Sequence, residues 1–192
     1  MRRFITLFAF MAIALTSYAQ ESSEYLSIKG VPIKGNMVEF CQKLLAKGLT
    51  YHGSENNAVL FKGEFTGRNA SIGVLSTDDG QNIVAVLVFF DPSGEWNSLV
   101  STYNYCKDLY TRKYGNPSVL KEVNPAYSNY NTDLMAEVYQ GTVVWACLWE
   151  TTGGEIEVSI EKSDGIYEGM VMICYRITQN EKAKIQNDLG DI

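Results

Sequence analysis

The chain has 192 residues, with 16 Lys and Arg against 22 Asp and Glu, a formal charge of −6 and a single histidine. Apolar residues make up 46% of the sequence and there are only four prolines, which is typical of a packed globular protein rather than a disordered one. The acidic balance argues against binding to the phosphates of nucleic acids. One histidine excludes metal sites built from several imidazoles. We therefore expect no nucleic-acid partner, no metal and no cofactor.

The N-terminus predicts a secretory signal peptide over residues 1–19. Arg2 and Arg3 form a positively charged start, and residues 4–15 form an apolar run. This run is shorter than the ~20 residues that cross a bilayer, and small residues precede a cut after Ala19. Cleavage would leave about 173 residues with a net charge of −8, because both arginines are lost. We therefore expect an exported protein, periplasmic or extracellular, without a membrane span. We expect no lipid anchor, because no cysteine follows the cut.

Two helices are predicted from apolar residues that recur at helical spacing. The first begins at Asn36, where Asn36 and Glu39 have the spacing of a capping box. It ends at Gly48, because glycine adopts the left-handed conformation at a helix end at little cost. The second helix covers residues 95–114 and stops before Pro117.

Segments with the character of β-strands follow each helix. After the first helix they lie near 58–66, 69–76 and 82–90, and after the second near 118–123, 133–140, 142–150, 154–161 and 168–177. Ile156, Val158 and Ile160 alternate with polar residues, which is typical of an antiparallel sheet with one wet face. Trp145 and Trp149 share one strand parity, so we expect them in the core. Residues 51–55, which include the lone histidine, are polar and are predicted as a loop.

This order of elements predicts an α+β fold over residues 20–177, with an antiparallel sheet and two helices packed on one face. Because each helix is followed by a run of strands, a tandem pair of α-β-β-β units with halves 36–91 and 92–177 also fits the order. A polar C-terminal tail is expected over 178–192.

Four widely spaced cysteines, Cys41, Cys106, Cys147 and Cys174, leave two alternatives open. They are either buried free thiols or form at least one disulfide, with three full pairings allowed. Their spacing excludes zinc ribbons and thioredoxin-like motifs. A dyad of Cys41 with His52 is unattractive, because Cys41 falls on the apolar face of the first helix, where a buried thiol is inert.

Motifs for catalysis are lacking: the sequence has no P-loop, no nucleophile elbow and no zinc-protease signature. We predict no catalytic residue. Glu155, Glu157 and Glu161 could supply the paired carboxylates of a glycosidase, but the regular row is better explained as a solvated strand face that also discourages edge pairing. Lys29 and Lys34, each beside a glycine, could bind an anion.

A connection rich in tyrosine and asparagine at 124–131 is the strongest candidate for recognition. Tyr, Ser and Asn are the residues of recognition loops, because tyrosine offers a large contact area at low entropic cost. We therefore predict Tyr127, Asn129 and Tyr130 as binding residues. The alternative is a loop that folds back on the sheet with its tyrosines half-buried.

Residues 35–48 and 96–99, with the helix stop at 113–117, resemble the corresponding parts of small exported proteins common in Bacteroidetes. That family has no assigned activity, so the resemblance implies no functional residues. At the level of the fold, tandem units of a helix and a meander resemble the β-lactamase-inhibitor protein and the small lipoproteins of outer-membrane assembly. The lipid-bearing cysteine of the lipoproteins is missing here.

These observations favour an exported, non-enzymatic protein that binds a macromolecule, either a protein or a glycan, through aromatic residues of the sheet face or the loop. One alternative is a carboxylate-dependent glycan hydrolase, and another is a passive structural component of the cell envelope. An exposed tyrosine patch beside a concave sheet would favour binding. Two carboxylates that face each other across a deep cleft would favour the hydrolase.

Overall fold

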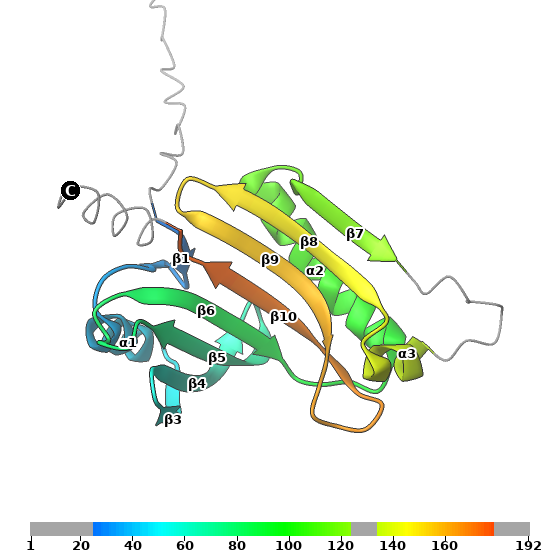
Figure 1. The fold of residues 1–192 in the computed structure, drawn as a ribbon, viewed down its shortest axis with the longest axis horizontal. Coiled ribbons are helices and arrows are strands. Elements are labelled where there is room, and N and C mark those ends of the chain that lie inside the picture. Colours follow the sequence, from blue (N-terminus) through cyan, green and yellow to red (C-terminus); the bar gives the residue numbers. More distant parts are fainter. Residues whose placement is uncertain (1–24, 124–133, 179–192) are drawn as a thin grey trace, which may run out of the picture.

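The computed structural model describes residues 25–123 and 134–178, and its main element is an eight-stranded antiparallel sheet (Figure 1). The strand order is β3-β4-β5-β6-β10-β9-β8-β7. Its strands are β3 (Thr50–Glu55), β4 (Ala58–Phe65), β5 (Arg68–Ser76), β6 (Ile83–Phe90), β7 (Val119–Val123), β8 (Val144–Thr151), β9 (Gly154–Lys162) and β10 (Gly169–Arg176). A small hairpin, β1 (Ser27–Ile28) and β2 (Val31–Pro32), precedes the helices α1 (Met37–Ala46), α2 (Trp96–Tyr114) and α3 (Leu134–Gln140).

The predicted α+β fold is confirmed, and the helix-first order occurs twice. The strands β3 to β6 follow α1, and the strands β7 to β10 follow α2. The last strand of each set, β6 and β10, pair antiparallel at the centre of the sheet. Each helix is therefore followed by four strands rather than three, and α3 is inserted between β7 and β8.

Helix α1 begins where the sequence indicates. Asn36 has extended backbone angles, and its side-chain oxygen accepts a hydrogen bond from the Val38 N–H at 2.8 Å, which satisfies one free donor of the first turn. Phe40 and Leu44, four residues apart, are buried on its inner side. Gly48 follows the helix with φ +85°, a conformation that glycine adopts without strain.

Both long helices cover the same face of the sheet. A row of opposed residues crosses six strands on this side, and all its members are buried: Phe61, Ile72, Val88, Ile173, Val158 and Cys147. Rings of α2 contact this side, with centroid distances of 5.6 Å from Tyr110 to Trp149 and from Tyr103 to Trp145. Met37 of α1 accepts a hydrogen bond from Ser76 on the same face. Trp149 is buried and Trp145 packs against the core, as expected from their parity.

Two local predictions are wrong. The segment 133–140 is the helix α3 rather than a strand, because Leu, Met, Ala and Glu favour helix and Met135 and Val138, three residues apart, pack inward together. The segment 51–55 belongs to the edge strand β3 rather than a loop. Most side chains of β3 are exposed, so the strand carries no apolar alternation that a sequence could reveal.

Several predictions fall outside the described residues. They are the signal peptide at 1–19, the binding residues Tyr127, Asn129 and Tyr130, and the tail beyond Thr178. Within residues 25–123 and 134–178, no helix combines the length and the apolar character needed to cross a membrane.

Candidate functional site

The face of the sheet that points away from the helices is the largest candidate surface. Because successive side chains of a strand point to opposite sides, the row next to the buried one faces outward. It crosses all eight strands through Gly53, Leu60, Gly73, Leu87, Cys174, Glu157, Leu148 and Val119. We call this surface the open face, because both long helices lie on the other side of the sheet.

Three leucines and a valine make up half of the outward row of the open face, whereas its Cys174 is buried. Leu60, Leu87 and Leu148 are partly exposed, and Val119 on the edge strand is 40% exposed. Two shallow depressions lie on it. One, of about 470 Å³, is lined by residues of β3 to β6 that include Phe89, and the other, of about 260 Å³, is lined by residues of β7 to β10. Apolar residues make up most of the lining of each depression.

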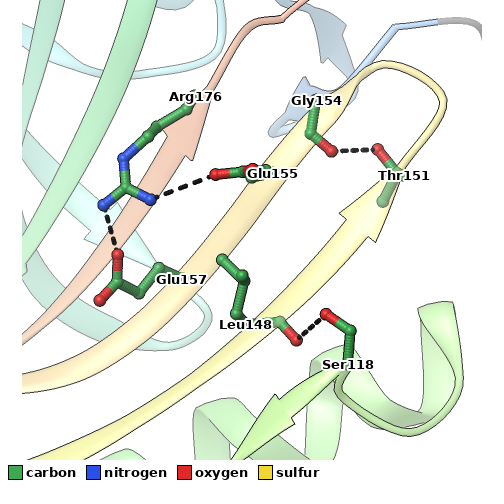
Figure 2. Close-up of polar contacts among 7 residues, drawn as sticks. All are labelled: Ser118, Leu148, Thr151, Gly154, Glu155, Glu157 and Arg176. Carbon is green, nitrogen blue, oxygen red and sulfur yellow. Dashed lines mark hydrogen bonds and ion pairs between the residues drawn. The ribbon is translucent and has the colours of Figure 1, made fainter.

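A charged cluster sits among these aliphatic residues (Figure 2). Arg176 of β10 donates hydrogen bonds to two carboxylates of β9, Glu155 at 3.4 Å and Glu157. Partial burial lowers the pKa of the Arg176 guanidinium, but the hydrogen bonds to Glu157 and Glu155 and the neighbouring charges together outweigh it, so the pKa lies above its ordinary value. The wet carboxylate row expected from the sequence thus has a cation between its members. The pairing of β10 with β9 brings Arg176 beside these carboxylates, and the sequence pattern does not reveal this pairing.

Side-chain bonds to the backbone fix the strands that carry the cluster (Figure 2). In the β8–β9 turn, the Thr151 hydroxyl donates to the Gly154 carbonyl at 2.8 Å and accepts from the Gly153 N–H at 3.2 Å. Ser118 donates to the Leu148 carbonyl from both its N–H, at 2.8 Å, and its hydroxyl, at 3.1 Å. These contacts hold β7, β8 and β9 in register, so the open face has a defined shape on this side.

The geometry of Glu155 and Glu157 differs from that of a glycosidase. The two carboxylates lie on the same side of one strand and share one guanidinium. Glycosidases place their two carboxyl groups on either side of the scissile bond. The pair Glu155 and Glu157 therefore lacks the opposed arrangement of glycosidase carboxylates.

All four cysteines, Cys41, Cys106, Cys147 and Cys174, are free thiols, which decides between the two alternatives left open by the sequence. Burial raises the pKa of Cys41 to about 11 and that of Cys106 to about 12. A reactive cysteine needs a lowered pKa, and His52 is exposed on the edge strand β3. The described part of the chain therefore holds no activated thiol, and no cluster of metal-ligating side chains is found in it.

We expect Cys41 to react with iodoacetamide at pH 8 roughly 100-fold more slowly than an unperturbed thiol, because its pKa is about 11 instead of 9.0 and only the thiolate reacts. The rate should rise about tenfold per pH unit up to pH 10. A raised pKa in the folded state also means that protonated Cys41 favours folding below about pH 9, and that this contribution is lost as the pH rises toward 11. Mass spectrometry of the Cys41 peptide measures the rate, with the protein in urea as control. A plateau of the folded-state rate near pH 9 would contradict the raised pKa.

Fold and site together define a protein class: an α+β protein in which, within residues 25–123 and 134–178, helices cover one face of an antiparallel sheet and not the other. Comparisons with protein-family models, with curated proteins and with solved structures found no match.

Proposed function

We propose that this chain is an exported, non-enzymatic binding protein whose open face docks against another protein. The observation that carries the proposal is the outward row across the sheet, in which Glu157 lies between Leu148 and Cys174 and is held by Arg176 of the neighbouring strand. Interfaces commonly have an apolar centre with a small number of oriented polar groups, and arginine is enriched in them.

The chemistry of the open face favours a protein partner over a glycan. Sugar-binding surfaces use exposed aromatic rings, on which the pyranose faces stack. Leucine and valine are the most frequent residues in the lining of the two depressions, and Phe89, the aromatic residue of the first depression, is only partly exposed. Aliphatic surface gains free energy mainly by removing water from a second apolar surface, at roughly 25 cal/mol per Å².

The charged cluster gives this surface orientation. About half of the Arg176 side chain is exposed, so its guanidinium can bind a further acceptor beyond its two glutamates. An ion pair at this exposure adds little to folding stability. The ion pair therefore contributes to binding mainly by orienting and selecting the partner, because a partner that places like charges opposite these groups is repelled.

Tyr127, Asn129 and Tyr130 remain predicted binding residues. They follow β7 in the chain, and β7 is the edge strand that carries Val119.

We expect a double substitution on the open face, Val119→Asp with Leu148→Asp, to weaken capture of the natural partner roughly tenfold or more, since buried charges without partners are costly at an interface. The mature chain, residues 20–192, is used to capture proteins from an extract of the producer's cell envelope. The captured protein is then purified, and its affinity for both forms is measured by calorimetry.

The matched control is Val38→Asp with Leu45→Asp, the same pair of changes on exposed positions of α1. This variant should bind like the unmodified chain. Equal loss in both variants, or in neither, would overturn the proposal. A protein that captures nothing would favour the passive envelope component. Release of sugar from envelope glycans that stops with Glu155→Gln would instead favour the hydrolase.

A further inference from the structure

A pocket of about 360 Å³ lies on the helix side of the sheet, opposite the open face. The β1–β2 hairpin, the β4–β5 turn, the last turns of α2 and strand β10 each contribute to its wall. The pocket thus lies where elements of the first and second helix-and-strand sets meet. Its volume is in the range of small-molecule sites, roughly 300–1,000 Å³. The proposed docking function makes no use of it.

Most of the wall is apolar and much of it is aromatic. Phe65 contributes aromatic surface and Leu109 aliphatic surface. The rings of Tyr110 and Tyr114 are nearly parallel, with an interplanar angle of 11° and 6.0 Å between their centroids. Tyr114 is only partly buried, so part of its ring is accessible to solvent. Offset stacking on such a ring favours a flat aromatic ligand.

The charged groups that line the pocket are both positive. Lys29 of the hairpin and Lys113 of α2 both line it, and none of its described lining residues carries a carboxylate, although the chain as a whole has a formal charge of −6. The Lys29 ammonium donates to the Glu64 carbonyl at 2.8 Å, which fixes its position and leaves two hydrogens for a ligand. The Lys113 ammonium lies 4.9 Å from the centre of the Tyr114 ring.

A pair of buried phenols completes the wall. The hydroxyls of Tyr110 and Tyr175 are hydrogen-bonded to each other. This bond uses one of the two hydroxyl hydrogens, and no acceptor for the other is found among the described residues. Burial is the main cause that raises the pKa of both phenols, so both stay protonated at neutral pH. The pair therefore adds no negative charge to the pocket.

We propose that this pocket binds a small aromatic carboxylate, with its ring against Tyr114 and Phe65 and its carboxylate between Lys29 and Lys113. An anion is attracted by both ammonium groups and meets no opposing carboxylate in the lining. A hydrogen bond to a charged group contributes more than a neutral one. This site is separate from the open face, so the two proposals can fail independently.

The test uses 2-naphthoate and its neutral counterpart 2-naphthamide as probes, with isothermal titration calorimetry on residues 20–192. We expect one saturable site for 2-naphthoate and an affinity at least roughly tenfold lower for the amide, which has the same ring but no charge. Equal affinities for the two probes, or no saturable binding of 2-naphthoate at millimolar concentration, would overturn the proposal.

Variants locate the site. Lys29→Gln and Lys113→Gln should each weaken binding of 2-naphthoate several-fold and leave that of the amide unchanged, whereas Lys62→Gln, the same change at an exposed position of β4, should alter neither probe. Both pocket lysines lie at partly or fully exposed positions, so these variants should fold. The open-face variant with Val119→Asp should bind 2-naphthoate normally. Loss in Lys62→Gln equal to that in Lys113→Gln would show a general charge effect and overturn the site.

Discussion

Replacement of Gly154 by alanine is expected to destabilise the fold by about 3 kcal/mol or more, the largest effect of any single methyl group in the described structure. Gly154 begins β9 with φ +141°, where side chains are rarely tolerated. An alanine Cβ at this position would lie 2.0 Å from the carbonyl oxygen of Arg176. That atom belongs to the backbone of β10, so no rotation of a side chain can relieve the overlap.

The consequence reaches the open face because Gly154 joins two of its elements. It accepts a hydrogen bond from Thr151 in the turn, and the next residue, Glu155, pairs with Arg176 across the two strands. To make room for a methyl group, β9 must move away from β10, and this breaks the register that brings the carboxylates to the guanidinium. We therefore expect loss of stability and loss of partner binding together.

Urea unfolding followed by circular dichroism measures this effect, and Gly67→Ala is its control. Gly67 has φ +78°, but nothing lies within 4 Å of a Cβ placed there. The control should therefore lose only the cost of backbone strain, roughly 1 kcal/mol. Equal midpoints for the two variants would show that the contact with the Arg176 carbonyl does not determine stability.

The sequence predicts the parts of this fold whose signals are local. The alternation of Ile156, Val158 and Ile160 gives β9 and its buried face, and helical spacing gives α2 nearly to the residue. These patterns work because a core-facing stripe repeats with the period of the element itself. The capping oxygen of Asn36 is likewise local, since it bonds two residues onward.

Features that depend on the register between strands could not be predicted from the sequence. The sequence places Arg176 in one strand and Glu157 in another, but only the antiparallel pairing of β9 with β10 brings them together. The same holds for the pocket, to which the chain contributes from four separate elements. Lys29 could be suspected of binding an anion, yet its neighbour Lys113, 84 positions along, could not be connected to it. The sequence pointed more strongly to Tyr127, which lies outside the described residues and stays a prediction.

The second large effect is expected at Trp149, where alanine should cost about 3–5 kcal/mol. Trp149 is 2% exposed and packs in the core between the sheet and α2, with its ring 5.6 Å from that of Tyr110. Its indole N–H also donates to the Gly115 carbonyl at 2.9 Å, which ties β8 to the residue that ends the helix. Truncation therefore leaves a large cavity and an unsatisfied carbonyl at the same time.

Two further substitutions separate these contributions. Trp149→Phe keeps most of the ring volume and removes the donor, so it should cost roughly 1–3 kcal/mol. Trp96→Ala removes a tryptophan that is only partly buried at the start of α2, and should cost less than Trp149→Ala. Urea unfolding of the three variants decides the matter. If Trp149→Phe destabilises the fold as much as Trp149→Ala, the hydrogen bond to Gly115 rather than the packed volume holds β8 against the helix. In that case both variants should also lose binding of 2-naphthoate in the pocket beside Tyr110.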